Sequence, residues 1–112
     1  MLNKVDEALF HPETDAILLT EVLHALSDPV RISIVSQLLA APEREMPCGT
    51  FQYSVAKSTF SHHIRVLREA GVIWVRHEGT RSMSSLRDAD LEARFPDLLG
   101  AVMKNAPQSE AP

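Results

Sequence analysis

The chain of 112 residues is predicted to fold as one mainly helical α+β domain that carries a β-hairpin. Two observations predict this class: apolar residues recur at helical spacing in several segments, and one pair of β-prone runs flanks a short turn with a glycine. An apolar content of 45% is sufficient for a modest core at this length. We expect an N-terminal arm over residues 1–12, the domain over residues 13–105 and a disordered tail over residues 106–112.

The first two helices are predicted before residue 42. From Thr14 or Asp15 to Leu26, apolar residues recur at a spacing that gives one wide apolar face. The stretch "SDPVRISIVSQLLAA" then supplies a helix start, in which Ser27 or Asp28 caps and Pro29 occupies the first turn. The second helix is therefore expected in the core.

A short connection and a polar helix follow. The stretch "PEREMPCGTFQYS" is rich in helix breakers, and we expect one short helix near Pro47 to Gln52. The stretch "KSTFSHHIRVLREAGV" predicts a helix that begins near Ser54 or Ala56, with Ser54 as a substitute cap, and stops at Gly71. At about 100° per residue, one side carries Ala56, Phe60, His63, Ile64, Leu67 and Ala70, and the other carries Lys57, Ser58, Ser61, His62, Arg65 and Arg68.

A hairpin and a last helical segment complete the domain. The runs Val72 to His77 and Arg81 to Leu86 are β-prone, and Gly79 between them can take a positive φ. The stretch "RDADLEARFPDLLGAVMKN" returns to helical spacing, with Asp88 as its cap and a break at Pro96.

The charge distribution favours a polyanionic partner for the polar helix. The formal net charge is −4, which alone argues against nucleic acid, but residues 54–87 hold six Lys and Arg against two Asp and Glu. A polar helix with short hydroxyl side chains, preceded by a tight turn and followed by a basic hairpin, is what a winged helix-turn-helix domain requires. Small hydroxyls let such a helix approach the major groove closely, and longer basic chains reach the phosphates.

The same stretches resemble a known family. "ALSDPVRISIVSQLL", then "KSTFSHHIRVLREAGVI" and a hairpin with "EGTRS", are similar to the ArsR/SmtB family of bacterial winged-helix repressors. The resemblance implies a homodimer paired through its first and last helices, which represses transcription from a double-stranded inverted-repeat operator near its own promoter. Carried over by position, the DNA contacts are Lys57, Ser58, Thr59, Ser61 and His62, with Arg81 on the wing. Arg65 and Arg68 are added because their side chains can reach phosphates.

The sequence departs from the metal-sensing members of that family. Thiolate sensors carry a CxC pair before the turn, where this chain has Cys48 alone, and zinc sensors carry histidines on the last helix, where this chain has none. We therefore expect no metal and no cofactor. The effector is expected to be an organic molecule in the dimer cleft or an oxidant of Cys48, with the organic molecule favoured.

Simpler interpretations stand beside these. His62 and His63 point about 100° apart on a helix and cannot readily share a metal ion, so His63 is expected to be a hydrogen-bonded core residue. Ser61 beside His62 lacks the turn and the acid of a hydrolase, and we expect no enzyme activity. The arginines could be a solvated basic face, and Cys48 could fill the core. An acidic protein-interaction module with the same fold is the alternative function.

Targeting features are missing from the sequence. No apolar run approaches the roughly 20 residues of a membrane span, and the N-terminus lacks the layout of a secretory signal. The single cysteine cannot form an intramolecular disulfide. We expect a soluble cytoplasmic protein with no membrane partner.

Overall fold

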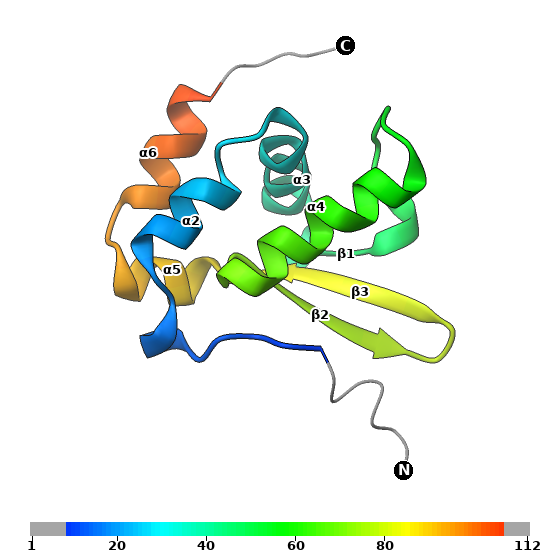
Figure 1. Cartoon of the computed structure of the whole chain (residues 1–112), viewed down its shortest axis with the longest axis horizontal. Helices are drawn as coiled ribbons and strands as arrows, with labels where there is room; N and C mark the ends of the chain where they lie inside the picture. Colours follow the sequence, from blue (N-terminus) through cyan, green and yellow to red (C-terminus); the bar gives the residue numbers. More distant parts are fainter. Residues whose placement is uncertain (1–8, 107–112) are drawn as a thin grey trace.

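The computed structural model describes residues 9–106 and confirms the mainly helical α+β, winged helix-turn-helix class (Figure 1). The described elements are α2 (Leu19–Ala25), α3 (Pro29–Ala40), α4 (Lys57–Ala70), α5 (Asp88–Arg94), α6 (Leu98–Asn105), β1 (Glu45–Pro47), β2 (Ile73–Glu78), β3 (Arg81–Leu86) and three 3-10 turns, η1 (Thr14–Ala16), η2 (Pro42–Arg44) and η3 (Cys48–Thr50). The outer part of the predicted arm, residues 1–8, and residues 107–112 of the predicted tail lie outside this range.

The helices gather on one side, and the β2–β3 hairpin extends away from them (Figure 1). Helix α4 packs against α2, α3 and β2, which places it at the centre of the fold. Helices α2, α5 and α6 lie at the side away from the tip of the hairpin (Figure 1). Among residues 9–106, the helices are all too short or too polar to span a bilayer.

Helix α3 begins as the sequence predicts. Asp28 is its N-cap, and its Oδ1 accepts hydrogen bonds from the backbone N–H of Val30 at 2.8 Å and of Arg31 at 3.3 Å. Pro29 is the first helical residue, where its missing N–H costs nothing. The helix buries Ile34, Val35 and Leu38 in the core.

The predicted first helix is interrupted, which corrects the expectation of one continuous helix from Thr14 or Asp15. After η1, Ile17 and Leu18 are extended, with ψ of 127° and 135°, and α2 begins only at Leu19. Tertiary packing explains the break. Ile17 is 1% exposed and lies so close to Gly71 that a Cβ there would be 2.7 Å from Ile17 Cγ1. The extended backbone also leaves the Ile17 carbonyl free to accept a hydrogen bond from Arg94 Nε at 3.2 Å.

Gly71 ends α4, as predicted. Its φ of 92° lies in the left-handed region, and its N–H returns to the carbonyls of Leu67 and Arg68. A residue with a side chain at this position would have a strained backbone, and its Cβ would clash with Ile17.

The three-stranded sheet contains a strand that the sequence did not predict. β1 pairs antiparallel with β3, with Met46 opposite Ser84, and the strand order is β1-β3-β2. Three residues are too few for an alternating pattern to be recognised. The short helix expected near Pro47 to Gln52 is only the 3-10 turn Cys48–Thr50. The hairpin agrees with prediction, and Gly79 has a φ of 65°.

Two predicted caps are wrong. The N-cap of α4 is Ala56, and no side chain within residues 9–106 accepts a hydrogen bond from its first turn, so Ser54 does not substitute. Asp88 is the first residue of α5 and not its cap, because Arg87 takes the N-cap position. The expected break at Pro96 is confirmed, since α5 ends at Arg94 and α6 starts at Leu98.

Candidate nucleic-acid interface

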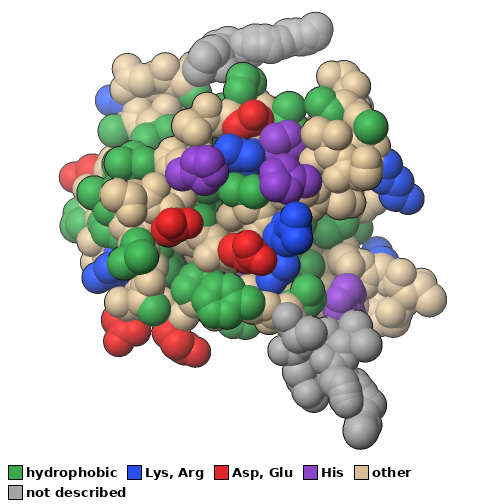
Figure 2. All heavy atoms as spheres, in the orientation of Figure 1, with side chains coloured by type: hydrophobic (Ala, Val, Ile, Leu, Met, Phe, Trp, Pro, Cys, Tyr) green, Lys and Arg blue, Asp and Glu red, His purple; other side chains and the backbone are tan. Residues whose placement is uncertain are grey.

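The outer face of α4 carries the polar residues that the sequence placed there. All of the following are exposed: Lys57, Ser58, Thr59, Ser61, His62 and Arg65. On the opposite side, Phe60, His63 and Leu67 are buried. Figure 2 shows histidine, basic and acidic side chains together near the middle of the face that α4 crosses. The predicted helical phase is therefore confirmed for the N-terminal half of the helix.

Arg68 departs from that phase and corrects the sequence interpretation. It is 8% exposed, and its Nη1 donates a hydrogen bond to the carbonyl of Phe10 at 2.7 Å. The segment before η1 passes over the C-terminal half of α4 and covers this guanidinium. Arg68 therefore anchors the N-terminal segment and is not part of the exposed face.

A buried guanidinium fixes α4 from behind. Arg31 Nη1 lies 3.0 Å from His63 Nδ1, while Arg31 Nε donates to the carbonyl of Ala25 at 2.7 Å and Nη2 to that of His24 at 3.3 Å. Because a guanidinium can only donate, His63 Nδ1 must accept. The ring is then neutral, with its proton on Nε2, which faces Asp28 Oδ1 at 3.9 Å. The prediction that His63 is a hydrogen-bonded core residue is confirmed.

Burial lowers the pKa of His63, and this agrees with the neutral ring. The carboxylate of Asp28 opposes the effect, whereas Arg31 and His62 lower the pKa further. Protonation would place a second positive charge against Arg31 in a site that is only 8% exposed.

On the β2–β3 wing, Arg81 is exposed to solvent. The Arg81 side chain is 62% exposed, and its Nη2 is 4.0 Å from Glu78 Oε1. Arg76 is already engaged, since its Nη2 lies 3.1 Å from Glu45 Oε1 and 2.7 Å from Glu78 Oε2. Arg81 is therefore the better placed of the two for an external anion.

The N-terminal segment also contacts the hairpin, which the sequence did not predict. The His11 ring stacks on Trp74 at 3.8 Å with an interplanar angle of 10°, and its Nε2 accepts a hydrogen bond from the backbone N–H of Val75 at 3.0 Å. Burial, then the charges of Arg68 and Arg87, lower the pKa of His11. No local sequence pattern relates residues so far apart in the chain.

Cys48 lies half-buried beside the sheet. Its Sγ is 3.1 Å from the hydroxyl of Ser84, which is fully buried on β3. Burial raises the pKa of the thiol, against the smaller lowering effect of Ser84. A thiol with a raised pKa forms less of the reactive thiolate and is oxidised less readily.

The histidines of α4 do not converge. The rings of His62 and His63 have centroids 5.8 Å apart and are tilted by 56°. Across residues 9–106, no group of three or more His, Cys, Asp or Glu side chains is placed to hold a metal ion.

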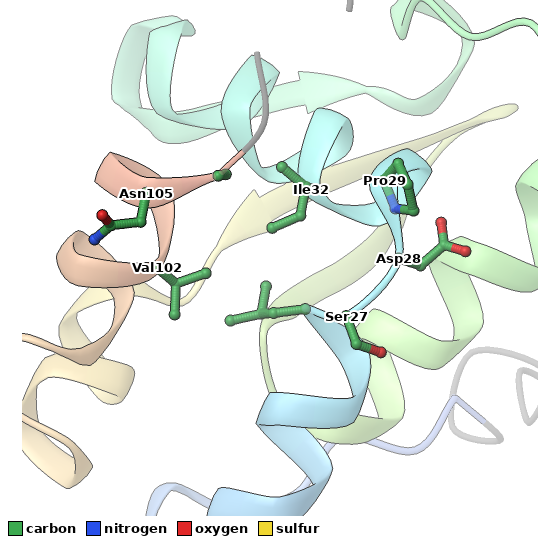
Figure 3. Close-up of a pocket in the computed structure, with 8 residues that line it drawn as sticks. Ser27, Asp28, Pro29, Ile32, Val102 and Asn105 are labelled. Carbon is green, nitrogen blue, oxygen red and sulfur yellow. The ribbon is translucent and has the colours of Figure 1, made fainter. Parts of the chain in front are cut away.

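A pocket of about 340 Å³ lies between the start of α3 and α6 (Figure 3). Its lining is mainly apolar: Leu26, Pro29, Ile32, Val102 and Ala106, with Ser27, Asp28 and Asn105. In Figure 3 the Asp28 carboxylate points away from the space between Ile32 and Val102. Asp28 thus belongs both to the wall of the pocket and to the contacts behind α4.

We predict that acid weakens the fold through His63. Burial lowers its pKa in the folded chain below the ordinary value of 6.5, so the neutral ring stabilises the fold above that value. This stability is lost as pH falls through the lowered pKa. The measurement is the free energy of unfolding by urea from about pH 8 to about pH 5.

The variant His63→Gln keeps an acceptor for Arg31 but does not titrate, and it should lose less stability in acid than the wild type. His62→Gln is the matched control and should follow the wild type, because His62 is exposed. His11 titrates in all three proteins and cancels in the comparison. Equal acid sensitivity of the wild type and His63→Gln would contradict the prediction.

Comparisons with known proteins agree with this geometry. Residues 26–76 match a family described as a helix-turn-helix domain. The uncharacterized HTH-type transcriptional regulator YceK of Bacillus subtilis (strain 168) is 29% identical over 89 residues, which cover 78% of this chain and 88% of YceK. The crystal structure of an ArsR family transcriptional regulator, RHA00566, has the same fold, with a TM-score of 0.62, 20% identity and coverage of 74% of this chain and 90% of that one. The family match shows a helix-turn-helix domain over residues 26–76, and the structural likeness shows that the chain shares the fold of that crystal structure.

Proposed function

We propose that the protein is a repressor that binds an inverted-repeat DNA operator as a homodimer and is released by an effector. The exposed polar face of α4, beside a wing with a solvent-exposed arginine, is the observation that carries this proposal. A DNA-bound repressor of this kind acts in the cytoplasm.

The face of α4 suits the major groove. Ser58, Thr59 and Ser61 have short side chains that allow the helix backbone to approach base edges, and His62 can donate or accept a hydrogen bond there. Lys57 and Arg65 flank these residues and reach phosphates, as does Arg81 from the wing. The N-terminal end of the helix dipole adds a favourable potential for phosphate at the same end.

An unpartnered apolar face suits a second copy of the chain. Leu18 is 56% exposed, and Leu19 and Leu23 are each 44% exposed. Leu18 is the N-cap of α2, and Leu19 and Leu23 lie within that helix. Two-fold pairing through this face would bring two copies of α4 to two half-sites. Val22, on the same helix, is buried in the core and does not belong to this face.

The effector is proposed to be an organic molecule. The apolar pocket between α3 and α6 has a volume of about 340 Å³, within the range of small-molecule sites. Its lining includes Asp28, Pro29 and Ile32 at the start of α3, and α3 packs against α4, so a molecule bound there would act on the DNA-binding helix through α3. The raised pKa of Cys48 makes the redox alternative less favourable.

We predict that operator binding separates base contacts from phosphate contacts. Ser61→Ala and His62→Ala should each weaken binding to the upstream DNA of the protein's own gene by about 1–3 kcal/mol, with little effect on random DNA. Arg81→Ala should weaken both and lower the salt dependence by about one phosphate contact. Gel-shift titrations at several salt concentrations measure both effects. Equal affinity of the wild type for upstream and random DNA would reject the repressor and favour a protein-interaction module.

We predict that the dimer forms through α2. The wild type should sediment as a dimer at micromolar concentration, and Leu23→Glu should be a folded monomer, because Leu23 is already exposed in the single chain. The operator affinity of the monomer should fall by at least about tenfold, since one half-site is lost. Ser36→Glu, which adds the same charge at an exposed position of α3, should remain a dimer. A monomeric wild type would exclude an inverted-repeat operator.

We predict that an organic molecule and not a metal releases the operator. The measurement is dissociation of the complex with zinc, nickel, arsenite, peroxide and a panel of small organic molecules, for the wild type and Cys48→Ser. Release by an organic compound from both proteins is expected. Release by a stoichiometric metal would contradict the proposal, and peroxide release that Cys48→Ser abolishes would establish the redox switch in its place.

A further inference from the structure

The turn that precedes α4 is held by a side chain of α3. Gln37 Nε2 donates to the carbonyl of Gln52 at 2.9 Å, and Gln37 Oε1 accepts from the N–H of Gln52 at 2.9 Å. The side-chain amide of Gln37 therefore pairs with both the N–H and the carbonyl of Gln52, in the way that a neighbouring β-strand would. Gln37 Nε2 also lies 3.1 Å from Ser33 Oγ, which helps to orient the amide. The backbone at Gln52 cannot rotate without losing two hydrogen bonds.

The next residue, Tyr53, lies against the first turn of α4. Its ring stacks on that of Phe60, with centroids 3.9 Å apart and an interplanar angle of 10°. Phe60 is 5% exposed, whereas Tyr53 is 40% exposed. Stacking therefore fixes the phenol ring while one part of it stays in solvent. Within residues 9–106, its hydroxyl has no hydrogen-bond partner.

The geometry points to Tyr53 as a phosphate-binding residue of the DNA interface, positioned by Gln37. The inference rests on the proposed DNA-binding function and extends the surface beyond α4 into the turn. Tyr53 lies beside the N-terminal end of α4, which is the end that enters the major groove in helix-turn-helix proteins. Tyrosine hydroxyls are common donors to phosphate oxygens at such interfaces.

Rigidity explains why a tyrosine suits this position. The stacked ring has already lost most of its rotational freedom, so binding a phosphate costs little further entropy. Gln37 contributes by keeping the backbone that carries the ring in place. Its two bonds to Gln52 lie at an exposed turn, so their loss should affect the position of Tyr53 more than the stability of the fold.

The test is a double-mutant cycle on DNA affinity with Tyr53→Phe, Gln37→Ala and the double variant. Tyr53→Phe keeps the stacked ring and removes only the hydroxyl. It should weaken binding to both upstream and random DNA by about fivefold, as expected for the net contribution of one hydrogen bond. The salt dependence should not change, because a neutral phenol displaces no counterion.

Gln37→Ala should weaken DNA binding by a similar factor, and the double variant should bind no more weakly than the weaker single variant. Ser36→Ala, at the exposed neighbouring position on α3, is the control and should bind like the wild type. Thermal unfolding of all variants shows that each is folded. Tyr53→Phe with wild-type affinity would overturn the inference, and effects that multiply in the double variant would overturn the role of Gln37. Failure of the wild type itself to prefer its upstream DNA would instead reject the proposed function.

Discussion

The position of α4 depends on the guanidinium of Arg31. This group is 7% exposed and joins the last carbonyls of α2 to His63 on α4. Breaking a buried network of this kind by removing one partner typically costs about 3–5 kcal/mol. Because Arg31 can only donate, it also sets the tautomer and the charge of His63. The polar face of α4 lies outward because its opposite side is held in this way.

The same structure divides the basic residues into two groups. Of the six between residues 54 and 87, Arg68 and Arg87 are buried, and Arg76 is paired with two glutamates. Lys57, Arg65 and Arg81 face outward. The surface available to DNA is therefore less basic than the sequence implies. Neutral donors such as Ser61 and Tyr53 consequently carry more of the proposed interaction, and the salt dependence of binding should be modest.

Much of this fold follows from local patterns in the sequence. Asp28 and Pro29 mark the start of α3, Gly71 the end of α4, and Gly79 the hairpin turn. Helical spacing also separates exposed His62 from buried His63. Each of these features depends on residues that are close together in the chain, which is why they could be predicted.

The features that could not be predicted depend on distant partners. Ile17 leaves the first helix because it packs on Gly71, and Arg68 is buried because the N-terminal segment passes over it. The link between Gln37 and Gln52 joins an ordinary polar helix position to a turn without regular structure. Nothing in the local sequence of these residues distinguishes them from solvated surface groups.

Amide hydrogen exchange with and without the upstream DNA duplex tests the proposed interface most directly. Bound DNA should slow exchange at residues 52–65, through the turn and the exposed half of α4, and at the wing around Arg81. Exchange in α2 and α6 should not change, because this face is proposed to pair with the second copy in both states. Protection confined to α2 and α6, or no protection at α4 with DNA bound, would contradict the account.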